Sequence, residues 1–142
     1  MTKEAILAAI PHRPPFLMLD EIVEQSSERI VCRKTFAENE YFYQGHYPNF
    51  PLTPGVLLCE AALQAGAVLL SQQATQAGGV PVATRMNEVK FKKMVHPGDT
   101  IDVEVTVTER LADTFFMTGK VTVGGKLAAR LDFACAMTQM PN

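Results

Sequence analysis

The longest apolar stretch of the chain runs from Gly55 to Leu70, and only Glu60 and Gln64 interrupt it. A proline-rich loop precedes it, in which Thr53 suits the N-cap of a helix and Pro54 its first position. A helix that is apolar on every side is normally buried on every side. The pattern therefore predicts a central helix over residues 54–73, about 30 Å long at ~1.5 Å per residue, wrapped by the rest of the chain.

The remainder of the chain alternates apolar and polar residues with the period of half-buried strands. The strands predicted in this way cover residues 16–24, 29–36, 88–92, 101–108, 114–123 and 126–138. The pairs Pro97-Gly98 and Gly124-Gly125 have the chemistry of tight turns. A short helix over Thr2–Ala9, capped by Thr2, precedes the strands. Successive hairpins and one dry helix indicate an antiparallel sheet curved round the helix, an α+β domain over residues 1–142.

Composition narrows the classes of function. The chain of 142 residues is 47% hydrophobic and 20% charged, as in ordinary globular domains, and its net charge of −2 argues against nucleic acid as the main partner. Its three cysteines are an odd number without metal-type spacing, which favours reduced thiols. Residues 2–10 do not have the pattern of a signal peptide, and the polar residues of the long helix argue against a membrane span. We therefore expect a cytoplasmic protein.

Two titratable residues indicate chemistry. Glu60 and Gln64 are four residues apart and share one face of the predicted helix. A carboxylate in such an apolar helix must be paired, hydrogen-bonded or held neutral. His46 lies fourteen residues before Glu60, in the loop, and two titratable groups in contrasting surroundings suit acid–base catalysis near neutral pH. Each residue also has a structural explanation: His46 could be a loop histidine that is bonded to backbone groups, and Glu60 could be a carboxylate that is bonded only to Gln64.

The segment from His46 to Gln64 also carries a family resemblance. GHYPNFPLTPGVLLCEAALQ, residues 45–64, resembles the GHFP…P..PGVL..EA..Q signature of β-hydroxyacyl-acyl-carrier-protein dehydratases of the FabZ type. IPHRPPFLMLD at residues 10–20 and KFKKMVHPGD at residues 90–99 resemble two further segments of that family. The resemblance implies a hot-dog fold. It also implies dehydration of (3R)-hydroxyacyl-acyl-carrier-protein to the trans-2-enoyl product in fatty acid biosynthesis, without a metal or an organic cofactor.

The same resemblance implies roles for single residues. His46 matches the base that removes the C2 proton, and Glu60 matches the carboxyl that assists departure of the 3-hydroxyl. Gly55 matches a glycine whose N–H binds the thioester carbonyl; a glycine that merely starts the helix is the alternative. Val56 matches a position that lines the pocket, and Gln64 is expected to orient Glu60, because an amide does not titrate. The family brings its histidine and its glutamate together across a homodimer interface, in a dimer or a trimer of dimers.

Two larger sets of residues are weaker candidates. Aromatic residues that suit an acyl tunnel, although core packing explains them equally well, are Phe42, Tyr43, Tyr47, Phe50 and Phe91. Basic residues that suit docking of an acidic acyl carrier protein, or else form a solvated strand face, are Arg85, Lys90, Lys92 and Lys93. His12 and Arg13 match the family without an evident chemical role.

Two rival functions remain open from the sequence. A hot-dog acyl thioesterase would use the same fold, since fold alone does not fix the reaction. A non-catalytic acyl-binding protein would need neither His46 nor Glu60. Coenzyme A in place of the carrier protein and the length of the acyl chain are open as well.

Overall fold

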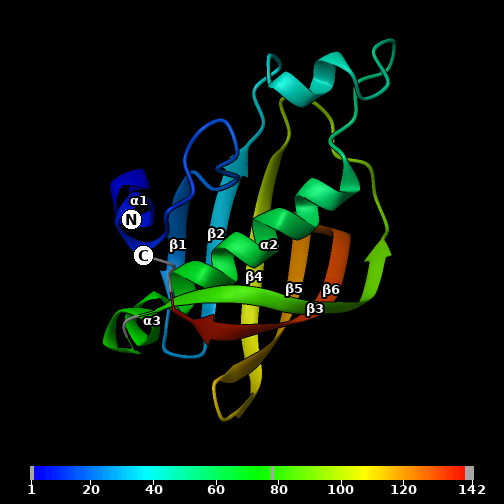
Figure 1. Cartoon of the computed structure of the whole chain (residues 1–142). Coiled ribbons are helices and arrows are strands. Elements are labelled where there is room, and N and C mark those ends of the chain that lie inside the picture. Colours follow the sequence, from blue (N-terminus) through cyan, green and yellow to red (C-terminus); the bar gives the residue numbers. More distant parts are fainter. Residues whose placement is uncertain (1, 78, 140–142) are drawn as a thin grey trace.

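A curved antiparallel sheet surrounds one central helix (Figure 1). The computed structural model describes residues 2–77 and 79–139, and within these the sheet has six strands in the order β1-β2-β4-β5-β6-β3. The helices are α1 (Lys3–Ala9), α2 (Gly55–Leu69) and α3 (Ser71–Ala77), with a short 3₁₀ helix at Tyr41–Gln44. The strands are β1 (Glu21–Gln25), β2 (Arg29–Thr35), β3 (Val80–Phe91), β4 (Thr100–Leu111), β5 (Thr114–Val123) and β6 (Lys126–Thr138). The predicted α+β architecture is confirmed.

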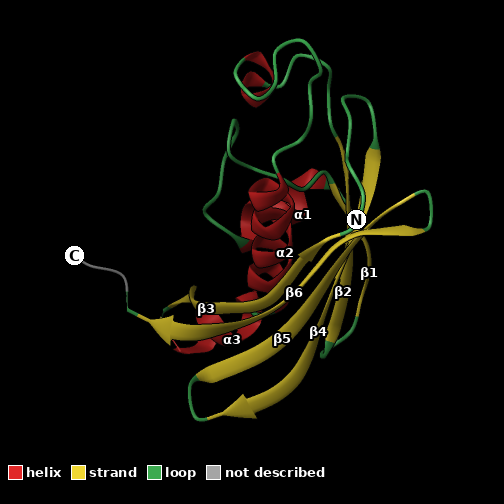
Figure 2. Ribbon diagram, turned by 90° about the vertical axis from the view of Figure 1, so that its right-hand side faces the viewer, coloured by secondary structure: helices red, strands yellow, loops and turns green. Residues whose placement is uncertain are grey.

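Small residues let α2 lie close against the sheet, which curls past it in Figure 2. A Cβ atom added to Gly119 of β5 would lie 3.0 Å from the Cβ of Ala62, and one added to Gly66 would lie 3.0 Å from the ring of Phe133. Side chains any larger would push the helix away, because protein interiors are close-packed. One side of the helix therefore lies in the core, and Gln64, the polar residue buried there, must find partners.

The central helix is shorter than predicted and begins differently. It covers Gly55–Leu69; the chain turns at Leu70 and continues as α3, where the prediction had one helix over residues 54–73. Pro54 occupies the cap position, and no side chain caps the helix there. The prediction that Thr53 caps α2 is wrong, because its hydroxyl is bonded elsewhere.

One face of α2 is not covered by this chain. Val56 is 70% exposed, and Glu60 and Leu63, which follow it on the same face, are half-buried. The prediction of a helix buried on all sides is therefore wrong for a single copy of the chain. The reason is that the curved sheet covers only the opposite side of the helix.

The strands after the helix follow the predicted pattern except at the edge of the sheet. The turn Gly124-Gly125 has φ of +57° and +79°, as a two-residue hairpin requires, and joins β5 to β6. Strand β3 is longer than predicted and pairs within the sheet only with β6, so most of its side chains are exposed. Phe91, predicted on a half-buried face, is 53% exposed for that reason. The first strand begins at Glu21 rather than at residue 16.

Among the residues that the structure describes, no helix is both long enough and apolar enough to span a membrane.

The loop between the 3₁₀ helix and α2 is tied together at its base. The hydroxyls of Tyr43 and Thr53 lie 2.5 Å apart in a buried hydrogen bond, and the Thr53 N–H donates to the carbonyl of Val95. Burial raises the pKa of Tyr43, so its hydroxyl remains protonated and available for this bond. Residues 45–52 therefore form a loop whose two ends are fixed to each other.

We expect Tyr43→Phe to lower the free energy of unfolding by about 1–2 kcal/mol, because it leaves the buried Thr53 hydroxyl without its partner. Urea unfolding measures the effect. Tyr43→Phe combined with Thr53→Val removes both polar groups, and this double variant should lose less stability than the sum of the two single variants. Simple additivity of the two losses would show that the hydroxyls do not interact.

Candidate functional site

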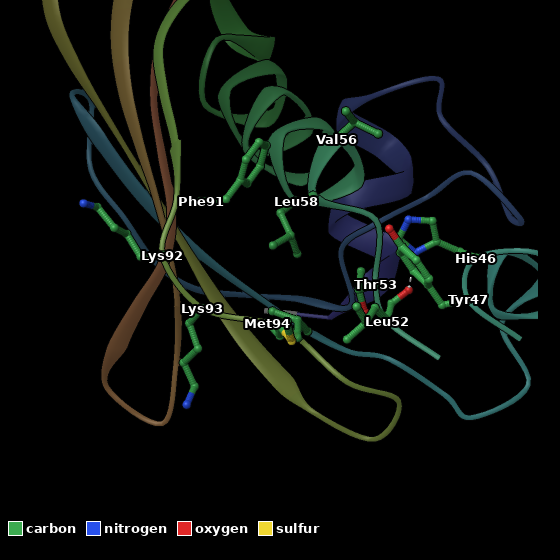
Figure 3. Close-up of a pocket in the computed structure, with 12 residues that line it drawn as sticks. His46, Tyr47, Leu52, Thr53, Val56, Leu58, Phe91, Lys92, Lys93 and Met94 are labelled. Atoms are coloured by element: carbon green, nitrogen blue, oxygen red, sulfur yellow. Dashed lines mark hydrogen bonds between the residues drawn. The ribbon is translucent and has the colours of Figure 1, made fainter. Parts of the chain in front are cut away.

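The loop places the imidazole of His46 with a defined tautomer. Its Nδ1 atom lies 2.9 Å from the carbonyl oxygen of Leu52, the contact drawn as a dashed line in Figure 3. A carbonyl oxygen can only accept, so Nδ1 carries the proton and Nε2 keeps its lone pair. The ring is half-buried, and Tyr47 packs edge-on against it with ring centroids 4.8 Å apart. When the ring is neutral, its basic nitrogen is therefore Nε2, which the bond to Leu52 leaves unused.

His46 lines the largest cavity described for the chain, with a volume of about 500 Å³ (Figure 3). The walls are mainly apolar. The lining residues are His46, Tyr47, Leu52, Thr53, Gly55, Val56, Leu58, Phe91, Lys92, Lys93, Met94 and Val95. Five residues predicted from the sequence for catalysis or substrate binding therefore lie around one cavity: His46, Tyr47, Gly55, Val56 and Phe91. A basic nitrogen in a mainly apolar cavity suits proton abstraction from an apolar substrate.

The first turn of α2 forms part of this cavity wall. The helix begins at Gly55, so the N–H of Gly55 has no partner within the helix, at its positively polarised end. The ring of Phe91 covers Gly55: an added Cβ would lie 2.8 Å from its Cε1 atom. Glycine therefore lets an aromatic side chain, or a substrate in its place, approach this backbone closely.

Glu60 and Gln64 touch as their spacing predicts. Gln64 is fully buried, and its Nε2 donates to Oε2 of Glu60 at 2.9 Å and to the Phe16 carbonyl at 3.0 Å. Its Oε1 accepts the Met18 N–H at 2.7 Å. Both amide hydrogens and the amide oxygen are thereby used, and the carboxylate is held in one place.

Glu60 lines a different cavity from His46. This second cavity, of about 330 Å³, is lined by His12, Glu60, Leu63, Ala67, Pro81, Val82, Ala83 and Cys135. One copy of the chain therefore presents His46 and Glu60 in two separate cavities.

The remaining predicted site residues are dispersed. Phe50 is 58% exposed and packs on His96, while Phe42 packs on Phe36. Lys92 and Lys93 lie at the cavity of His46 and point in different directions, as Figure 3 shows.

The other two basic residues predicted for docking do not line that cavity. Lys90 is exposed on β3. Arg85 lines a groove with Glu109 and Asp132 instead. The structure therefore does not gather the four basic residues round one cavity.

Two residues to which the sequence assigned no role lie next to the site. His12 lies in the second cavity with Glu60, at 3.8 Å between Nε2 and Oε2. The guanidinium of Arg13 donates to the carbonyls of Leu7, Ile10 and His12, and so ties this segment to the end of α1. The contact between His12 and Glu60 joins positions far apart in the sequence, and no local pattern reveals it.

The cysteines are poor nucleophiles. Burial raises the pKa of Cys32 to about 12 and of Cys135 to about 11, and it also raises the pKa of Cys59. A thiol that remains protonated is weakly reactive. All three side chains are buried, so a role in core packing accounts for them.

Comparison with known proteins identifies related chains. Residues 10–132 match the model of the FabA-like domain. The chain is 39% identical over 128 residues to a 3-hydroxyacyl-[acyl-carrier-protein] dehydratase FabZ of Clostridium perfringens strain SM101, a match that covers 90% of this chain and 92% of the relative. It is 41% identical over 133 residues to the FabZ of Oenococcus oeni, and this match covers 93% of this chain and 96% of the relative.

Solved structures show the same fold at lower identity. A chain of the dehydratase heterocomplex ApeI:P from Xenorhabdus doucetiae superposes with a TM-score of 0.76 at 14% identity, over 96% of this chain and 91% of that one. The PaaI protein of E. coli superposes with a TM-score of 0.67 at 18% identity, over 82% and 81%. The predicted hot-dog fold is confirmed.

The bond from His46 to Leu52 predicts the tautomer of the imidazole in solution. At about pH 9, above the ordinary titration range of histidine, we expect His46 to carry its proton on Nδ1. Long-range ¹H–¹⁵N correlation spectra distinguish the two ring nitrogens by their chemical shifts. A proton on Nε2 of His46 under these conditions would contradict the geometry.

Proposed function

Because the chain belongs to the FabA-like domain family, we propose that it dehydrates (3R)-hydroxyacyl-acyl-carrier-protein to the trans-2-enoyl product, with His46 as base and Glu60 as acid. Relatives named 3-hydroxyacyl-[acyl-carrier-protein] dehydratase are about 40% identical over at least nine-tenths of the chain. The proposal places the chain in fatty acid biosynthesis.

The observation that carries the mechanism is the hydrogen bond from His46 Nδ1 to the Leu52 carbonyl at 2.9 Å. It leaves Nε2 as a base toward the cavity, where it takes the C2 proton of the substrate. The electrons of the broken C–H bond form the C2–C3 double bond as the C3–O bond breaks. The carboxyl of Glu60 gives its proton to the departing hydroxyl, and water leaves.

The thioester carbonyl belongs at the N-terminus of α2 in this proposal. Negative charge develops on its oxygen as the C2 proton is removed, and the Gly55 N–H is placed to stabilise that charge. Val56, Leu58 and Phe91 give the cavity an apolar wall next to this position. The substrate must therefore bind with its thioester carbonyl at Gly55, its C2 atom at His46 and its 3-hydroxyl group at a carboxyl.

That carboxyl comes from a second copy of the chain. His46 and Glu60 line separate cavities, and exposed apolar side chains lie at these cavities and on β3. They include Val56 at 70%, Val82 at 43% and Met86 at 50% exposure, next to the free edge of β3. Exposed apolar surface of this kind marks an interaction site. A symmetric homodimer through this surface would complete each site with His46 of one protomer and the partner subunit's Glu60.

The acyl carrier protein would approach the mouth of the His46 cavity. Lys92 and Lys93 are exposed there and suit an acidic partner. Lys90 lies two residues away on β3 and is exposed too, so it extends this basic surface. Arg85 lies in a groove with Glu109 and Asp132, and we leave it out of the docking surface.

We expect the wild-type protein to convert a short 3-hydroxyacyl-carrier-protein into the conjugated enoyl product. His46→Ala and Glu60→Gln should each lower kcat at least about 100-fold, the usual contribution of a general acid or base. Ultraviolet absorbance of the enoyl thioester follows the reaction, and thermal unfolding checks that the variants are folded. Release of free thiol in place of the enoyl product would instead identify a thioesterase.

A mixture of two inactive variants tests the shared site. When His46→Ala and Glu60→Gln chains are co-expressed, half of the dimers are mixed and each has one intact site, so about a quarter of the wild-type activity should return. Each variant expressed alone, which forms only homodimers without an intact site, provides the control. If no activity returns although mixed dimers are isolated, His46 and Glu60 act within the same chain and the dimeric site is wrong.

A further inference from the structure

The segment between α1 and β1 reaches the carboxyl group that we assign as the acid. Nε2 of His12 lies 3.8 Å from Oε2 of Glu60, and the imidazole stacks on the ring of Phe16 with centroids 6.4 Å apart and planes 15° apart. Its Nδ1 atom is buried without a hydrogen-bond partner among the residues described. His12 therefore directs its one partnered nitrogen at Glu60.

We propose that His12 is a positioning residue for Glu60. Its imidazole interacts with the carboxyl group and holds that group where it can protonate the leaving hydroxyl. The proposal deepens the proposed function and rests on it. Gln64 and His12 both contact Oε2 of Glu60, so Oε1 remains free for the substrate. Three residues thereby form one unit: an amide, a carboxyl and an imidazole.

The backbone holds His12 firmly enough for this role. Arg13 donates to the carbonyl of His12 itself at 2.7 Å, and to those of Ile10 and Leu7 at 2.8 and 3.0 Å. The other neighbour of the ring, Phe16, is fixed through its carbonyl by the amide of Gln64. The same buried amide thus holds both the carboxyl and the segment that carries the imidazole.

Few other charges act on the pair. His12 lies between the cavity of Glu60 and a neighbouring one of about 340 Å³, and among the described residues that line them only Glu60 and Cys135 are titratable besides His12. Burial raises the pKa of Cys135 to about 11, so its thiol is neutral at working pH. Arg13 is turned to backbone carbonyls, and Lys3 of α1 pairs with Asp20. Within one chain, Glu60 is therefore the titratable group in contact with His12, and in the proposed dimer the partner subunit's His46 faces Glu60 as well.

The arrangement suits an acid that must become an anion during the reaction. When the carboxyl gives up its proton, the new carboxylate accepts the Gln64 N–H and faces Nε2 of the His12 imidazole, which can donate to it when it carries a proton. Both interactions are stronger with the carboxylate than with the neutral acid. They therefore stabilise the transition state more than the ground state, which raises kcat rather than binding.

Histidine titration tests the coupling without any assay of activity. The chain has three histidines, His12, His46 and His96, and their ring signals can be followed by NMR against pH. In Glu60→Gln we expect the His12 midpoint to change by at least about half a unit, because the titratable carboxyl in contact with its Nε2 atom is replaced by an amide that does not titrate. His96, which pairs with Asp99, should not move. An unchanged His12 midpoint would overturn the proposal whatever the protein catalyses.

Kinetics test the role in the reaction. His12→Asn should lower kcat about tenfold with KM within twofold of wild type, and should displace the pH profile of kcat. His12→Phe keeps the stacking on Phe16 but removes both nitrogens, so it should show the same loss. His96→Asn is the matched control and should retain wild-type kinetics. A wild-type kcat and pH profile in a folded His12→Asn protein would refute the positioning role.

The two readouts separate the two proposals. If the NMR titration shows coupling but the wild-type protein forms no enoyl product, the dehydratase assignment fails while the contact between His12 and Glu60 stands. If the wild type dehydrates and neither the titration nor the His12→Asn kinetics change, the assignment stands and His12 is only a packing residue.

Discussion

The buried amide of Gln64 is the interaction on which the site depends. Its side chain is fully buried and belongs to α2, the helix that small residues allow to lie close against the sheet. An unpaired amide group in this position would cost about 1–3 kcal/mol. The chain satisfies it with the Met18 N–H, the Phe16 carbonyl and the Glu60 carboxyl. The same three bonds fix the carboxyl of Glu60, which we propose as the acid, and bring the N-terminal segment, with His12, to the helix.

The two halves of the proposed chemistry are held in different ways. Glu60 stands on a helix in the core, whereas His46 stands on a loop that is closed by the bond between Tyr43 and Thr53 and by its own bond to Leu52. Tyr47, directly after the base, has a φ of +56°, a conformation that residues other than glycine rarely adopt. Strained backbone next to a reactive group is retained where its surroundings fix it. Here the tied loop provides that fixation.

The sequence predicts what depends on local pattern and motif. The hairpin at Gly124-Gly125, the two strands that it joins, and the pairing of Glu60 with Gln64 all follow from spacing alone. Prediction from the sequence pattern fails where a group distant in the sequence forms the hydrogen bond that the local pattern assigns elsewhere. Thr53 has the chemistry of a cap but is bonded to Tyr43, and residues 16–18 have the pattern of a strand but give backbone groups to Gln64. The contact of His12 with Glu60 spans 48 positions and leaves no periodic trace.

The error about the central helix is itself informative. Its sequence is apolar on all sides, yet one chain leaves Val56 70% exposed and Glu60 and Leu63 half-buried. Burying a valine side chain is worth about 1.5–3 kcal/mol, and an uncovered apolar face on a core helix forfeits that gain. The sequence pattern and the single-chain structure agree if a second copy covers this face. The surface that would bury Val56 is then the surface that would bring His46 to the partner subunit's Glu60. The packing of the helix and the completion of the site therefore both require a second copy of the chain on this face.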